Sequence, residues 1–297
     1  MDAELRMFAT ITPVIVPIVA CIVLGIWWGR SQPSFPNGFV GDLVMKIGAP
    51  ALIIGTLGAT DLAFSALLEV ALAALVLMLI TAILAVLVCT ICGWPVRDIG
   101  VPLVAGNSGN MGLPLCLFAF GPEGLALSLG VFVLFSLIHF SLGTAILTAS
   151  VPGRALLRSP LIWSGLLAIV LIAFEVEFST TVGNTLNLLG GMAIPLMLLT
   201  LGVSLVELKL RDAATALAMG AARIGVSLTA GVITVMVLEL EGVLRGVILL
   251  QAATPAAVFN YLLAQQYRRS PEAVAGLVMA STVISFATIP LVVGFLL

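Results

Sequence analysis

Two short polar segments interrupt apolar stretches of the sequence and hold the residue types best suited to chemistry. The first, residues 106–114, reads GNSGNMGLP, and the second includes Gln251, Thr254 and Pro255. Glycine and proline make a continuous helix costly, so the backbone is predicted to unwind at both places. Uncharged donors beside the N-terminal ends of restarting helices favour a small anion as ligand.

These residue types predict a binding site and three hinge residues. Neither segment contains Asp or Glu, which argues against a cation as the main substrate, although backbone carbonyls and amides could still hold a coupling ion. We predict that the substrate is bound by Asn107, Ser108, Asn110, Gln251 and Thr254. The hinges at the break are predicted at Gly112, Pro114 and Pro255.

Two ionisable residues lie within apolar stretches. A charge inside a membrane helix is expensive and is usually functional or paired, so Arg223 could contact an anionic substrate, pair with a carboxylate or reach toward an interface. His139 could relay protons or pack as a hydrogen-bonded core residue. Both remain candidates for a charge partner or relay.

The composition excludes a soluble protein and several classes of partner. Hydrophobic residues make up 61% of the chain and charged residues 9%, far from the balance of a soluble domain. With a net charge of −2 and no basic block, we expect a lipid bilayer and no nucleic acid as partner. No GxxxxGK[ST] motif is present, and Cys89 and Cys92 lack a second pair, so we expect neither a cofactor nor a metal site.

A membrane helix needs about 20 apolar residues, and this criterion predicts an all-α protein with ten transmembrane helices. The predicted spans are 8–29, 39–60, 66–92, 98–119, 124–149, 160–176, 184–206, 214–238, 243–265 and 273–297. Positive residues mark the cytoplasmic side. They follow odd-numbered spans at Arg30, Arg97, Arg154, Arg158, Lys209, Arg211, Arg268 and Arg269. We therefore expect a multi-pass protein of the cell (inner or plasma) membrane with both termini extracytoplasmic.

The two halves of the chain, 1–150 and 151–297, share a few short sequence motifs at similar positions. Pro50 before TLG at 56–58 recurs as Pro195 before TLG at 200–202, and Pro122-Glu123 recurs as Pro271-Glu272. Because each half has five predicted spans, the second half would enter from the opposite face of the bilayer. The sequence thus predicts an inverted five-plus-five repeat in which broken spans four and nine cross near the midplane.

Five segments give the chain a family resemblance as well. The sequence resembles the auxin efflux carrier family and its bacterial PIN-like members in APALIIGTLGATDL, GNSGNMGLPLCLFAFGPEGLA, PLMLLTLGVSL, QAATPAAVFNYLLAQQY and LVMASTVISFATIPL. The resemblance implies crossed helices four and nine, with Asn107, Pro114 and Pro255 at the crossing. It also implies a dimerising scaffold of helices 1, 2, 6 and 7, and an elevator-like transport unit of helices 3–5 and 8–10. We accordingly expect a homodimer that effluxes or exchanges small mono- or dicarboxylates.

Two other functions fit parts of the sequence. A sodium- or proton-coupled symporter or antiporter of the bile-acid-symporter type would also cross broken helices, and the coupling ion, H⁺ or Na⁺, is left open. An intramembrane serine protease is a remote alternative, since residues 106–109 spell GxSG and His139 is available as a base. A non-enzymatic transporter of organic anions remains the main prediction.

Overall fold

The computed structural model describes residues 3–32, 34–59, 64–148, 158–174, 176, 178–208 and 212–296. Every regular element in these ranges is helical. Of the predicted cytoplasmic residues, Arg154, Lys209 and Arg211 lie outside the described ranges, as does most of the segment joining the two halves.

The first part of the chain forms long helices with local π-helical turns. Its elements are α1 (Ala3–Ser31), α2 (Asn37–Leu43), η1 (Val44–Gly48), α3 (Ala49–Ala59), α4 (Phe64–Cys92), η2 (Val96–Gly100), α5 (Val101–Val104), η3 (Ser108–Gly112), α6 (Leu113–Ile138), η4 (His139–Gly143) and α7 (Thr144–Thr148). Within α6, Gly121 has a φ of 65° and a ψ of −155°, and Pro122 follows it. The helix therefore ends and restarts at this glycine.

The second part consists of shorter helices and two long ones. Its elements are α9 (Pro160–Ala173), α10 (Thr180–Gly191), α11 (Ala193–Glu207), α12 (Ala213–Val237), α13 (Gly242–Ala253), α14 (Phe259–Gln266) and α15 (Pro271–Leu296). Asp212 caps α12 by accepting hydrogen bonds from the backbone N–H groups of Ala214 and Thr215, at 3.1 and 3.2 Å. Such a cap satisfies donors that the first helical turn leaves unpaired.

Seven helical segments among the described residues are long and apolar enough to cross a membrane. They are Ile11–Ser31, Asn37–Gly58, Ser65–Cys92, Ser108–Leu147, Thr180–Glu207, Ala213–Val237 and Pro271–Leu296. Two more apolar helices, α9 and α13, are shorter. The chain is thus a multi-pass, all-helical membrane protein, and the count of ten spans stays a prediction.

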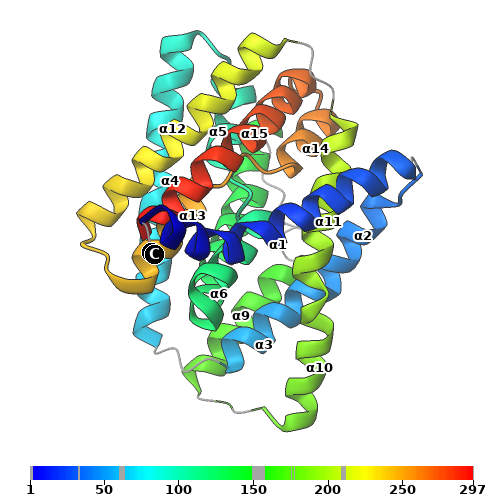
Figure 1. Ribbon diagram of the computed structural model, residues 1–297, viewed down its shortest axis with the longest axis vertical. Coiled ribbons are helices and arrows are strands. Elements are labelled where there is room, and N and C mark those ends of the chain that lie inside the picture. Colours follow the sequence, from blue (N-terminus) through cyan, green and yellow to red (C-terminus); the bar gives the residue numbers. More distant parts are fainter. Residues whose placement is uncertain are drawn as a thin grey trace.

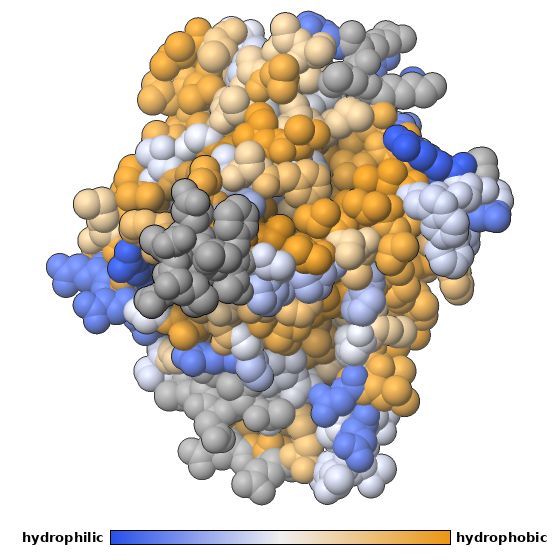
Figure 2. Space-filling view, viewed as in Figure 1, coloured by the Kyte–Doolittle hydropathy of each residue, from blue (hydrophilic) through white to orange (hydrophobic). Residues whose placement is uncertain are grey.

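Helix α4 shows why lipid surrounds this fold. Its buried face carries small and medium apolar residues, including Val70, Ala74 and Leu77. Its opposite face is just as apolar and exposed, at Leu68, Leu72, Leu75, Leu79, Ile83, Val86, Leu87 and Ile91. A helix that is apolar all round needs an apolar solvent. Apolar residues likewise cover much of the face in Figure 2, where hydrophilic residues form small separate groups.

The densest helix contacts fall into two sets, and Figure 1 shows α1 running from one set across to the other. In the first set, named the scaffold group after the prediction, α1 packs along α11 and α3 packs against α9 and α10, with α2 and η1 beside them. In the crossing group, α12 packs against α4, α13 and α15, and η2, α5, η3, α6, η4, α7 and α14 complete the group. Helix α6 contacts members of both groups.

Glycines let α1 and α11 approach until their backbones touch. A Cβ added to Gly25 would lie 2.2 Å from the carbonyl oxygen of Leu199, and one added to Gly202 would lie 2.2 Å from that of Ile22. Small residues at such a contact are typical of membrane helices, which associate through close van der Waals packing.

We predict that Gly25→Ala separates α1 from α11 and lowers the thermal unfolding temperature of the purified protein. The added methyl group meets rigid backbone, and overpacking of this kind typically costs about 1–3 kcal/mol. Gly225→Ala is the matched control, because Gly225 also lies within a long helix but a Cβ there meets nothing within 4 Å. Equal unfolding temperatures for the two variants would contradict the close contact.

Candidate functional site

Two broken helices meet at the centre of the crossing group. One break separates α5 from η3, and the other separates α13 from α14. The N–H of Asn107 donates to the carbonyl of Pro255 at 2.7 Å, and the N–H of Ala257 donates to that of Ala105 at 3.0 Å. These bonds form an antiparallel bridge between Gly106 and Ala256. Each unwound segment thereby satisfies backbone groups of the other.

The unwound part of the first segment is shorter than the sequence predicted. Residues 105–107 are non-helical, whereas Ser108–Gly112 already forms a π-helical turn. Pro114 lies in the first turn of the α-helix that follows. It has no N–H to donate to the carbonyl four residues earlier, which accounts for a wide turn rather than a regular α-helical start.

Polar side chains brace the crossing on several sides. The amide nitrogen of Asn260 donates to the carbonyl of Ala105 at 3.0 Å. The hydroxyl of Ser281 accepts a hydrogen bond from the N–H of Ala256 at 3.1 Å. The hydroxyl of Thr254 donates to the carbonyl of Gln251 at 2.7 Å. Backbone groups freed by the breaks therefore find partners inside the protein, as a low-dielectric surrounding requires.

Arg223 lies behind the crossing, and its side chain is 2% exposed. Its Nη1 donates to the carbonyl of Leu103 at 2.9 Å, and its Nη2 donates to that of Thr254 at 3.2 Å. Leu103 lies in the last turn of α5, and Thr254 caps the C-terminal end of α13. The guanidinium therefore joins the C-terminal ends of both half-helices.

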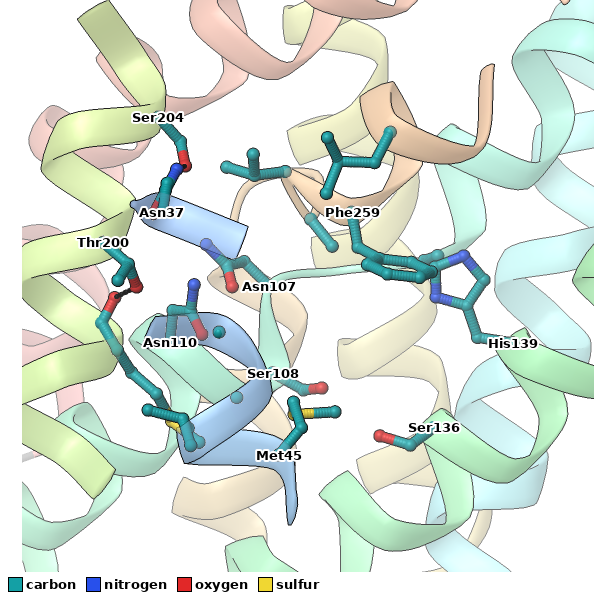
Figure 3. A pocket seen from close by; sticks show the side chains of 18 of the residues that line it. Asn37, Met45, Asn107, Ser108, Asn110, Ser136, His139, Thr200, Ser204 and Phe259 are labelled. Carbon is teal, nitrogen blue, oxygen red and sulfur yellow. Dashed lines mark hydrogen bonds between the residues drawn. The ribbon is translucent and has the colours of Figure 1, made fainter. Parts of the chain in front are cut away.

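A cavity of about 710 Å³ opens on the other side of the crossing. Of the predicted site residues, Asn107, Ser108, Asn110 and His139 line it. Its walls include η3 and the start of α14, together with residues of α2, η1, α11 and η4. Figure 3 shows Asn107 and Asn110 in the middle of this view, with Thr200 and Asn37 on one side and His139 on the other. The volume suits a small organic ligand.

The remaining predicted residues lie outside the cavity lining, which does not include Arg223, Gly112, Pro114, Gln251, Thr254 or Pro255. Gln251 is 1% exposed, and neither atom of its amide has a hydrogen-bond partner among the described residues. It packs against Gly112, where an added Cβ would lie 2.3 Å from its Oε1. Gly112 thus makes room for Gln251.

Several polar lining residues were missed from the sequence, namely Asn37, Ser136, Thr200 and Ser204. Asn37 donates to the hydroxyl of Ser204 at 2.8 Å. The carboxylates of Asp42 and Glu207 also line the cavity, and Asp42 forms an ion pair with Lys46. Thr200 belongs to the TLG recurrence at residues 200–202, which pointed only to an internal repeat.

His139 begins the π-helical turn η4 and stands against two aromatic rings. Its ring stacks on Phe140 at 5.6 Å between centroids and meets Phe259 edge-on at 6.0 Å. Its Nε2 has no hydrogen-bond partner within the described ranges, so it does not bond to the Ser108 hydroxyl. The Ser108–His139 pair therefore lacks the hydrogen bond through which this nitrogen would activate a nucleophile.

Comparison with known proteins identifies the class. A family model described as a membrane transport protein matches residues 145–293, just over half of the chain. The chain belongs to this family of transporters, which is the auxin efflux carrier family that the sequence resembles.

The chain is also similar to two curated relatives that are named as transporters. The chain is 28% identical over 193 residues to an uncharacterized transporter of Methanothermobacter thermautotrophicus, covering 62% of the chain and 63% of that relative. It is 25% identical over 201 residues to an uncharacterized transporter of Methanocaldococcus jannaschii, covering 63% of the chain and 64% of that relative. The chain thus matches a little under two thirds of the length of either relative.

We predict that Ser281→Ala destabilises the crossing, because it leaves the buried N–H of Ala256 without a partner. An unsatisfied buried donor costs about 1–3 kcal/mol. Ser285→Ala is the matched control: Ser285 is also 0% exposed on α15, but within the described part of the chain its hydroxyl donates to the carbonyl of Thr282 in its own helix. The purified Ser281→Ala variant should unfold at a lower temperature than Ser285→Ala. The reverse order would contradict a stabilising role for the hydrogen bond between Ser281 and Ala256.

Proposed function

We propose that this transporter carries small organic anions, such as mono- or dicarboxylates, through the cavity at the crossing. The observation that carries the proposal is that both restarting half-helices begin at this cavity. The start of η3 is lined by Asn107, Ser108 and Asn110, and the start of α14 by Val258 and Phe259. The positive end of the helix dipole favours an anion at such a place.

A side chain at the crossing also favours an anion as the ligand. Asn107 is 4% exposed, and its amide nitrogen has no hydrogen-bond partner among the described residues. A carboxylate oxygen is a suitable acceptor for this donor. The carboxylates of Asp42 and Glu207 belong to the opposite wall, on the scaffold group, so neither broken segment brings a negative charge to the bound anion.

We further propose that the chain crosses the membrane ten times in an inverted repeat. The restart at Gly121 divides Ser108–Leu147 between two spans, and α9 and α13 supply two shorter ones. Two contacts support placing the ends of spans three, five and nine on one side: Arg97 Nε donates to the carbonyl of Ile146 at 2.7 Å, and Ser270 donates to Asp98 at 2.7 Å. Arg97 and Asp98 lie between spans three and four, Ile146 lies near the end of span five, and Ser270 follows span nine; we propose that this side is cytoplasmic.

An elevator-type motion fits the arrangement of the two groups. The cavity lies between α2, η1 and α11 of the scaffold group and η3, η4 and α14 of the crossing group. Asn37 and Ser204 bond to each other within the scaffold group, whereas Arg223, Asn260 and Ser281 bond within the crossing group. Sliding of one group past the other would carry the bound anion without breaking these bonds. Dimerisation through the scaffold in the cell membrane completes the proposal.

We predict that Asn107→Ala strongly reduces anion transport while the protein still folds. Losing a hydrogen bond to a charged ligand should weaken binding about tenfold or more. Asn107→Asp should be at least as damaging, because its carboxylate repels an anion. The measurements are uptake of labelled mono- and dicarboxylates into proteoliposomes and thermal stabilisation of the purified protein by the same ligands.

Asn184 supplies the matched control, since it is exposed on α10 and does not line the cavity. Asn184→Ala and Asn184→Asp should transport like the unmodified protein. Full transport by Asn107→Ala would place the substrate elsewhere than at the crossing.

A further inference from the structure

Arg223 is a buried cation whose hydrogen bonds go to backbone carbonyls. It lies within Ala213–Val237, one of the segments apolar enough to span a membrane, and is 2% exposed. Within the described ranges, the acceptors of its hydrogen bonds are the carbonyl oxygens of Leu103 and Thr254 rather than a carboxylate. A buried charge is costly unless something of opposite sign compensates it.

Those two carbonyls supply the opposite sign. The C-terminal end of a helix carries a partial negative charge, and two such ends meet here. In transporters with discontinuous helices, unwound carbonyls and half-helix C-terminal ends are the groups that coordinate a coupling Na⁺. The guanidinium of Arg223 already occupies this kind of position.

Gly106 leaves room for the guanidinium group of Arg223. A Cβ added to Gly106 would lie 2.3 Å from Nη2 of Arg223 and 2.8 Å from the hydroxyl oxygen of Thr254. Gly106 also lines the cavity, so the guanidinium and the cavity lie on either side of one backbone segment. The positive charge is therefore close to the bound ligand without touching it.

We propose that Arg223 is a tethered cation that takes the place of a coupling Na⁺ at the crossing. This inference rests on the proposed anion site, and it makes Arg223 a positioning residue that sets ion dependence. It holds the C-terminal ends of α5 and α13 together and adds a fixed positive charge behind the anion. Anion binding by the unmodified protein then needs no sodium.

The test measures ligand-induced thermal stabilisation of the full chain in detergent. The probes are acetate, malonate and malate, each titrated in sodium chloride and in choline chloride. The variants are Arg223→Lys, which keeps the charge, and Arg223→Gln, which removes it but keeps an amide donor. Arg245→Gln is the matched control, because Arg245 is an exposed arginine whose guanidinium stands over the ring of Phe295, away from the crossing.

We expect the unmodified protein and Arg245→Gln to bind the effective carboxylate equally in both salts. Arg223→Gln should bind it about tenfold more weakly in choline, because the Coulomb attraction of a fixed positive charge behind the anion is lost, and should regain affinity in sodium. Arg223→Lys should remain independent of sodium, with weaker binding, because one ammonium does not reproduce the two-armed geometry of a guanidinium.

Several outcomes would overturn the tethered cation. They are sodium-dependent binding by the unmodified protein, unchanged affinity in Arg223→Gln, and sodium dependence acquired by Arg223→Lys. If Arg223→Gln does not fold, the sodium dependence of Arg223→Lys decides whether the inference stands. If no carboxylate stabilises the unmodified protein, the proposed function fails first. In that case the role of Arg223 is tested with sodium chloride alone. If sodium raises the unfolding temperature of Arg223→Gln but not of the unmodified protein, the inference is supported. If sodium affects both proteins equally, the inference is rejected.

Discussion

The fold depends on one constraint: a backbone that stops being helical inside a membrane must find new hydrogen-bond partners within the protein. Both polar segments meet it by pairing with each other, through the N–H of Asn107 and the carbonyl of Pro255 and through the N–H of Ala257 and the carbonyl of Ala105. Neither break could exist alone inside the protein without leaving buried backbone groups unpaired. The crossing therefore lowers the cost of both breaks by pairing their backbone groups. Ser281 and Asn260 provide hydrogen bonds to further backbone groups of the crossing.

Crossing two broken helices also separates charge. The N-terminal ends of η3 and α14 face the cavity, whereas the C-terminal ends of α5 and α13 face Arg223. Partial positive charge thus gathers on the cavity side of the crossing, and partial negative charge gathers where a fixed cation compensates it. The proposed anion site would therefore arise from backbone geometry, with uncharged side chains such as Asn107 giving it direction.

The sequence located the breaks well because their signals are local. Clustered glycines and proline at 106–114, and Thr254-Pro255 in the second half, directly change backbone preference. The length of the first break was harder to predict, because the π-helical turn Ser108–Gly112 depends on how the following helix starts. The role of Arg223 was out of reach, since its acceptors lie 120 and 31 residues away in the chain. The cavity wall formed by Asn37 and Ser204 depends likewise on packing between helices distant in sequence.

Rigidity is distributed in a way that suits transport. Helices α1 and α11 touch through Gly25 and Gly202, so a displacement between them would force backbone atoms into one another. The crossing is held by backbone bonds and by Arg223, whose two hydrogen bonds would both break if α5 and α13 moved apart. The cavity lies between these two stiff parts, lined on one side by Thr200 and on the other by Asn110. The cavity therefore marks the boundary between the two helix groups, and the proposed sliding motion would take place along this boundary.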